Sequence, residues 1–136
     1  MVATPLVPTS WGELLDKITI LQIKQERLDD NAKRANVVNE LTALLTVASV
    51  ALAQVTALAA ELKAINEALW EIEDHIRDKE REGAFDARFI ELARAVYVTN
   101  DRRAAVKRKI NQALSSALVE EKSYRPYGPG PGTASQ

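Results

Sequence analysis

The polar residues best suited to chemistry stand on two stretches that helix pairing would bring together. They are Asn66, Glu67, Glu73 and Asp74 on the first stretch, and Asn100, Asp101, Arg103 and Lys107 on the second. Carboxylates beside arginine and lysine could bind a small polar or anionic ligand between helices. The alternative is a polar layer that fixes helix register and antiparallel orientation, as buried asparagine does in coiled coils. We favour the layer and keep the ligand pocket as the second interpretation.

Other kinds of reactive site find little support. Cysteine is absent, which excludes disulfides, thiolate nucleophiles and cysteine-built metal sites. The single histidine, His75, would need a glutamate three residues earlier for a di-iron motif, and Ile72 stands there. No nucleophile elbow, phosphate loop or dinucleotide fingerprint occurs. We therefore predict no catalytic residue, metal or cofactor, and interpret His75 as a half-exposed helical residue.

Length and composition indicate one globular domain. The chain has 136 residues, of which 46% are hydrophobic and 27% charged, with only 5 Gly and 5 Pro. The predicted organisation is an extended N-terminal segment (1–9), a single helical domain (10–124) and a Pro/Gly-rich tail (125–136).

The charge is balanced overall but unevenly distributed. The net charge is −1, so no basic field favours nucleic acid or anionic lipid. Residues 61–86 carry 9 acidic and 4 basic residues, and residues 87–136 carry 4 acidic and 9 basic ones. Antiparallel pairing of these stretches would place opposite charges side by side. The basic run 102–109 lacks interleaved aromatic residues, which favours a solvated or paired helix face over nucleic-acid binding.

The sequence predicts an all-α fold of three helices. From Glu13 to Glu82 there is neither Gly nor Pro, and good helix formers dominate. We expect a long antiparallel hairpin (about 32–82 and 87–121) with a shorter N-terminal helix (about 11–29) packed alongside. Ser10 and Glu13 form a capping-box pattern, Asp86 suits an N-cap and Gly83 suits a helix C-terminus.

Apolar residues at alternating steps of four and three predict a coiled-coil seam along the long helix. They are Leu41, Leu45, Ala48, Leu52, Val55, Ala59, Leu62, Ile65, Leu69, Ile72 and Ile76. A turn near Gly83 pairs residues whose numbers sum to about 169, given equal helical rise on both sides. Arg103 then faces Asn66, and Asn100 lies near Leu69. The N-terminal helix brings residues 10–16 close to residues 122–124.

The uncharged stretch from Leu41 to Ala60 is long enough to span a membrane. Its many Ala, Thr and Ser residues, and the absence of a flanking Trp/Tyr belt, favour a helix covered by protein. No basic residue precedes Lys17, so a secretory signal is not expected. We predict a cytoplasmic protein without a membrane span.

The N-terminal helix is apolar nearly all round, more than one partner helix can cover. We therefore expect a homo-oligomer, most simply a dimer, with residues 41–60 as the contact. A patch near the middle of the molecule is the candidate surface for a protein partner. It comprises Trp11, Glu13, Lys17, Lys122 and Tyr124.

Four stretches of the sequence resemble a small bacterial family of unknown function. They are VPTSWGELLDKITIL (7–21), NEALWEIEDHIR (66–77), FIELAR to NDRR (89–103) and EEKSY (120–124). The resemblance implies an accessory role in bacterial surface-polysaccharide synthesis.

Two functions follow from these observations. The first is a non-enzymatic helical module for self-association and protein interaction. The alternative is a small all-α enzyme or sensor that binds an anionic metabolite in an interhelical pocket. That pocket would use Arg103, Lys107, Glu73 and Asn100.

Overall fold

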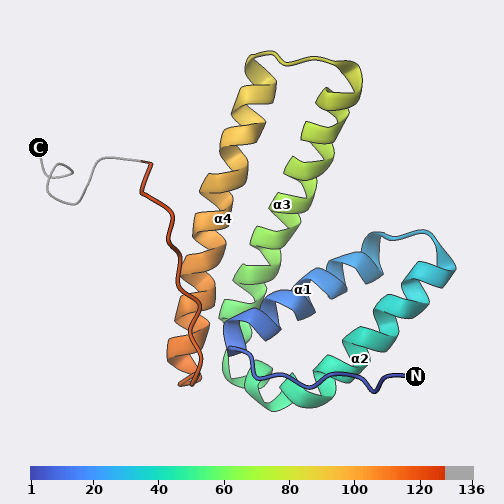
Figure 1. Ribbon diagram of the computed structural model, residues 1–136, viewed down its shortest axis with the longest axis vertical. Helices are drawn as coiled ribbons and strands as arrows, with labels where there is room; N and C mark the ends of the chain where they lie inside the picture. The colour runs from blue at the N-terminus through green and yellow to red at the C-terminus, as the bar shows by residue number, and fades with distance from the viewer. Residues whose placement is uncertain (128–136) are drawn as a thin grey trace, which may run out of the picture.

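The computed structural model describes residues 1–127 and shows four α-helices in this part of the chain (Figure 1). They are α1 (Trp11–Arg27), α2 (Asn31–Gln54), α3 (Thr56–Glu82) and α4 (Ala87–Ala113). Consecutive helices form two hairpins, α1 with α2 and α3 with α4, and α1 also packs against α3 and α4. The chain is all-α, but the prediction of three helices is wrong.

Short polar side chains begin three of the helices. Ser10, Asp30 and Asp86 each accept a hydrogen bond from the backbone amide three residues later, at 3.1, 2.9 and 3.0 Å. Each bond satisfies an amide that the first helical turn leaves unpaired. Gly83 ends α3 with a φ of 65°, a left-handed conformation that glycine adopts without strain. The predicted starts near residues 11 and 87 are confirmed.

The expected continuous helix from 32 to 82 is interrupted at Val55, whose φ and ψ of −129° and 36° are not helical. The hydroxyl of Thr56 donates to the carbonyl oxygens of Leu52 and Ala53, at 3.4 and 3.5 Å. Such bonds compete with the helical backbone, and β-branched residues have low helix propensity. Tertiary packing adds to this, because the bend lets α2 fold back along α1. Sequence patterning missed the break since neither Gly nor Pro marks it.

The third predicted helix is also shorter than expected, since α4 ends at Ala113 rather than near 121. Ser115 has a φ of 50°, and Ser116 donates its hydroxyl to the carbonyl oxygen of Leu118 at 2.6 Å. The chain reverses there, and residues 117–127 run back along α4 (Figure 1). Residues 128–136, most of the predicted Pro/Gly-rich tail, lie outside the described residues.

One hydrophobic core joins all four helices, and α1 lies at its centre. Leu15 and Ile18 of α1, Leu62 of α3 and Ile110 of α4 are completely buried. Val37, Leu41 and Ala48 of α2 pack into the same cluster. The apolar surface of α1 is therefore covered within one chain and, contrary to the expectation from the sequence, does not require a second copy.

Gly12 allows α1 to approach α4 very closely. Its backbone amide donates to Oδ1 of Asn111 at 2.7 Å. A Cβ atom at this position would lie 2.6 Å from the carbonyl oxygen of Lys107. No side chain larger than hydrogen fits without moving the backbone of α4, so glycine here sets the distance between the two helices.

The acidic α3 and the basic α4 lie antiparallel as expected, but among residues 1–127 no acidic side chain of α3 forms an ion pair with a basic side chain of α4. Within the part of the chain that is described, acidic residues of α3 pair with Arg27 of α1 or within their own helix. At the turn of this hairpin, Lys79 in the last turn of α3 forms an ion pair of 2.9 Å with Asp86, the N-cap residue of α4. Long charged side chains on the exposed faces point to solvent, where pairing contributes little.

Candidate functional site

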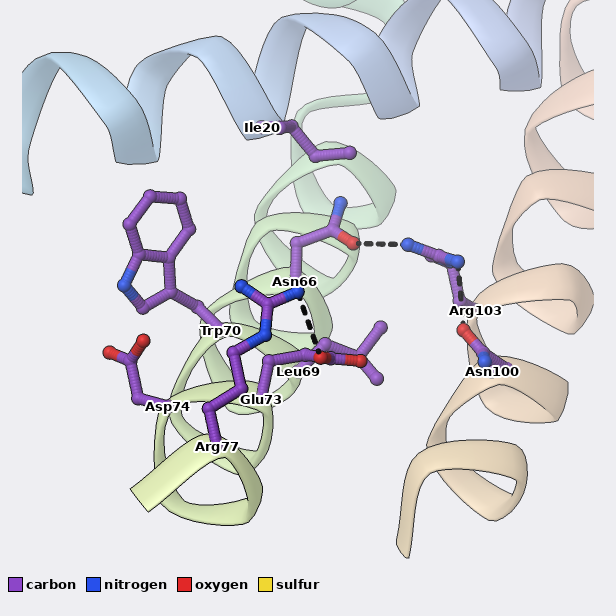
Figure 2. Close-up of a pocket in the computed structure, with 9 residues that line it drawn as sticks. All are labelled: Ile20, Asn66, Leu69, Trp70, Glu73, Asp74, Arg77, Asn100 and Arg103. Carbon is purple, nitrogen blue, oxygen red and sulfur yellow. Dashed lines mark hydrogen bonds and ion pairs between the residues drawn. The ribbon is translucent and has the colours of Figure 1, made fainter. Parts of the chain in front are cut away.

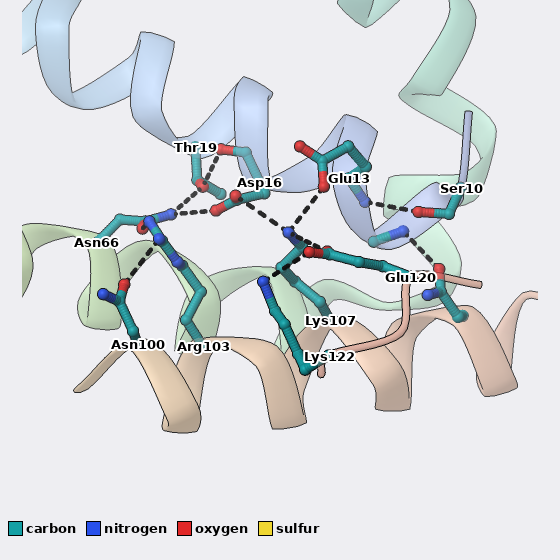
Figure 3. Close-up of polar contacts among 12 residues, drawn as sticks. Ser10, Glu13, Asp16, Thr19, Asn66, Asn100, Arg103, Lys107, Glu120 and Lys122 are labelled. Atoms are coloured by element: carbon teal, nitrogen blue, oxygen red, sulfur yellow. Dashed lines mark hydrogen bonds and ion pairs between the residues drawn. The ribbon is translucent and has the colours of Figure 1, made fainter. Parts of the chain in front are cut away.

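A chain of buried polar contacts crosses the junction of α1, α3 and α4 (Figure 3). Asn66 of α3 donates from Nδ2 to Oδ1 of Asp16 at 2.8 Å and to Oγ1 of Thr19 at 2.9 Å. Its own Oδ1 accepts from Arg103 of α4 at 3.2 Å, and Arg103 also donates to Oδ1 of Asn100 at 2.7 Å. The predicted register that sets Arg103 against Asn66 is confirmed.

Lys107, one turn further along α4, is surrounded by three carboxylates. Its Nζ lies 2.8 Å from Glu13, 2.9 Å from Glu120 and 3.5 Å from Asp16. The lysine is only 8% exposed and Asp16 7%. Lys107 is therefore the cation that neutralises the buried Asp16, and its charge is already fully compensated within the chain.

The pKa of Lys107 reflects two opposed influences. Burial of the ammonium favours the neutral form, but hydrogen bonds to Glu13 and Glu120 and the nearby charge of Asp16 outweigh it and raise the pKa above 10.5. A raised pKa means that the stabilisation is fully present below 10.5 and is lost as pH rises through the folded-state value. Lys107 is thus charged at neutral pH.

Glu120 ties the returning C-terminal segment to the body of the molecule. Its carboxylate accepts from Lys122 at 2.7 Å and from Lys107 at 2.9 Å. These two hydrogen bonds lower the pKa of Glu120 from 4.5 to about 2. Because the pKa of this carboxyl group is lowered, the contact is complete above pH 4.5 and weakens as pH falls toward 2.

Replacing Glu120 with glutamine should release this segment. The neutral amide keeps one acceptor but loses the charge that holds Lys107 and Lys122, so tryptic cleavage after Lys122 should become several-fold faster at neutral pH. Glu121→Gln is the matched control, because Glu121 is exposed and lies 3.5 Å from Arg108. Equal cleavage rates for both variants would show that Glu120 does not hold the segment.

The same junction contains a cavity of about 370 Å³ between α1, α3 and α4 (Figure 2). Arg103, Asn100 and Asn66 form one side of it. Glu73, Asp74 and Arg77 form the other, with an ion pair of 3.5 Å between Glu73 and Arg77. Ile20, Leu69 and Trp70 supply the apolar lining.

The eight residues of the predicted polar cluster do not all meet. Five of them, Asn66, Glu73, Asp74, Asn100 and Arg103, line this cavity. Asp101 and Lys107 line a second cavity of about 140 Å³, which Arg103, Lys122 and Tyr124 also border. Glu67 lies apart from both cavities, with its carboxylate 3.7 Å from Arg27 of α1.

The five residues of the predicted partner patch have different roles. Trp11 packs against the hydrophobic core, and Glu13 belongs to the Lys107 network, not to a reciprocal bond with Ser10. Lys17 is exposed and lies 3.5 Å from Glu40 of α2. Lys122 lies 5.8 Å above the ring of Tyr124, which is 79% exposed. Of the five, Lys122 and Tyr124 are therefore the pair that touch one another on an open surface.

Sequence reasoning missed Asp16, Thr19 and Glu120 as members of the site. Asp16 and Thr19 stand three residues apart and interrupt the apolar face of Leu15 and Ile18. Polar residues on a buried face require partners, which was the available signal. Glu120 gave none, because its position depends on the chain reversal at Ser115.

The remaining candidates are His75 and the basic run 102–109, which lie mostly on the surface. His75 is exposed, and no group of three or more His, Cys, Asp or Glu side chains in residues 1–127 is arranged to hold a metal ion. In the basic run 102–109, Arg103 and Lys107 turn inward, Arg108 lies 3.5 Å from Glu121, and Arg102 and Lys109 are exposed.

Fold and site together define an all-α protein of two helical hairpins with a buried polar junction. The chain belongs to the family of unknown function DUF6165, whose model matches residues 6–135. No curated protein and no solved structure matches the chain.

Proposed function

We propose that this chain is a helical self-association module in which α2 docks on a second copy. The observation that carries the proposal is the exposure of α2. This helix contains an 18-residue stretch apolar enough for a membrane span, yet only 22% of that stretch is buried within the chain. Monomeric soluble proteins rarely leave large contiguous apolar surfaces uncovered.

The exposed face of α2 has the pattern of a helix-pairing surface. Asn36, Ala43, Val47, Val50 and Gln54 are all exposed and follow one another at steps of seven, four, three and four. Such spacing keeps residues on one side of a helix. The three central residues are small or β-branched, which allows a second helix to approach closely, and Val47 is 65% and Val50 73% exposed. The polar Asn36 and Gln54 mark the two ends of this apolar face.

Several features favour a second copy over a lipid surface. The face has no Trp or Tyr, which usually anchor helices at a membrane interface. From Leu41 to Ala60 there is no charge, so two copies of this stretch meet without like-charge repulsion. Length and composition alone would let α2 cross a membrane, but core helices of soluble proteins pass the same test.

Glutamate substitutions on this face should produce monomers. In Val47→Glu and Val50→Glu the new charge would be buried at the interface without a partner, which is costly. Light scattering coupled to size exclusion should give the 15.0 kDa monomer mass for both variants and a larger mass for the parent chain.

Ser49→Glu is the matched control, because Ser49 is exposed but lies on another side of α2. It should retain the parent mass. A monomeric parent chain that floats with anionic lipid vesicles would contradict the proposal and assign α2 to membranes instead.

A further inference from the structure

Arg103 carries a charge that the chain does not neutralise. Its guanidinium is half-buried and donates to two neutral acceptors, the amide oxygens of Asn66 and Asn100. Among residues 1–127 it forms no ion pair, in contrast to Lys107 with its three carboxylates. An arginine held in this way favours an anionic group from outside the chain, because charge-assisted hydrogen bonds are the strong ones.

The position of Arg103 is fixed before any ligand arrives. Asn66 is 4% exposed, and its amide nitrogen is committed to Asp16 and Thr19. That commitment turns its oxygen toward Arg103, as Figures 2 and 3 show. A group held by such supporting contacts loses little conformational freedom on binding, which favours affinity.

The opposite side of the cavity restricts the kind of anion. Glu73 and Leu69 lie on α3 across from Arg103, and Trp70 and Asp74 lie further out on the same helix (Figure 2). Glu73 is 3.5 Å from Arg77, but both side chains of this pair are exposed, so the pair contributes little and the carboxylate is open to a ligand. A bare anion such as phosphate would face two carboxylates, which the exposed Arg77 offsets only in part. A molecule with a carboxylate at one end and an ammonium group beside an apolar body would meet a suitable partner on each side.

We propose that this cavity binds a free amino acid with an apolar side chain. Its carboxylate is held by Arg103 and Asn100, its ammonium group faces Glu73, and its side chain packs on Leu69 and Trp70. A volume of about 370 Å³ suits a small molecule of this kind. Lys107 takes no part, because its charge is already compensated.

The test uses L-phenylalanine and 3-phenylpropanoate, two probes that differ only in the amine, with isothermal titration of the full chain. Phenylalanine should bind more tightly. Arg103→Ala should weaken both probes at least about tenfold, Arg103→Lys should retain part of the affinity, and the exposed neighbour Arg102→Ala should change neither. Glu73→Gln should remove the preference for phenylalanine and leave 3-phenylpropanoate unchanged.

Thermal unfolding of each variant separates lost binding from lost folding. If Arg103→Ala does not fold, Arg103→Lys, which preserves the charge, takes its place in the comparison. Three results would overturn the proposal: no heat from phenylalanine with the parent chain, equal binding of inorganic phosphate, or phenylalanine affinity that a folded Arg103→Ala retains. None of these results depends on whether α2 forms an interface.

Discussion

Replacing Lys107 with methionine should lower the free energy of unfolding by about 3 kcal/mol, because removing one member of a buried ion pair leaves the other charge without compensation. The charge left behind is Asp16, which is 7% exposed. Glu13 and Glu120 are more exposed and can turn to water, so they add less to the cost. Thermal denaturation should show a fall of about 10 °C in the melting temperature.

Two further variants test whether the loss of stability comes from the uncompensated charge of Asp16. Lys109→Met removes an exposed lysine from the same helix and should change stability by no more than about 0.5 kcal/mol. Asp16→Asn in the Lys107→Met background should recover part of the loss, because the amide can still accept from Asn66 but needs no counter-charge. Equal melting temperatures for Lys107→Met and Lys109→Met would show that the network contributes no stability.

The second large effect is expected from Gly12→Ala. The added methyl group would lie 2.6 Å from the carbonyl oxygen of Lys107 and 3.0 Å from Oδ1 of Asn111. The first of these atoms belongs to the backbone of α4, so relief requires the helices to separate. We expect a loss of about 2 kcal/mol, within the range for overpacked interiors, measured by urea denaturation at a fixed protein concentration.

Gly83→Ala is a comparison in which the loss of stability comes from backbone conformation and not from a steric clash. Nothing lies within 4 Å of a Cβ atom there, but the φ of 65° is unfavourable for alanine. The left-handed conformation should cost about 1 kcal/mol. If Gly12→Ala were as stable as the parent chain, the close contact between α1 and α4 would not exist in solution.

Helix capping and helix register could be predicted from local sequence because both depend on short-range rules. Ser10, Asp86 and Gly83 occupy the ends that their side-chain chemistry or backbone freedom dictates. The meeting of Asn66 with Arg103 followed from constant helical rise on either side of one turn.

The features that the sequence did not predict depend on tertiary packing. The break at Val55 lets α2 pack along α1 instead of continuing α3, and neither Gly nor Pro marks it in the sequence. The reversal at Ser115 brings Glu120 to Lys107 across the surface of α4. From the sequence, Asp16 and Thr19 could be recognised only as polar interruptions of an apolar face. Asn66, which bonds to both, was predicted to meet only Arg103.

Sedimentation equilibrium of the unmodified chain over a range of micromolar concentrations tests the central claim most directly. If two copies pair through α2, the apparent mass should rise with concentration from 15.0 kDa toward twice that value. A constant mass of 15.0 kDa at every concentration would contradict self-association and leave the apolar face of α2 to another partner.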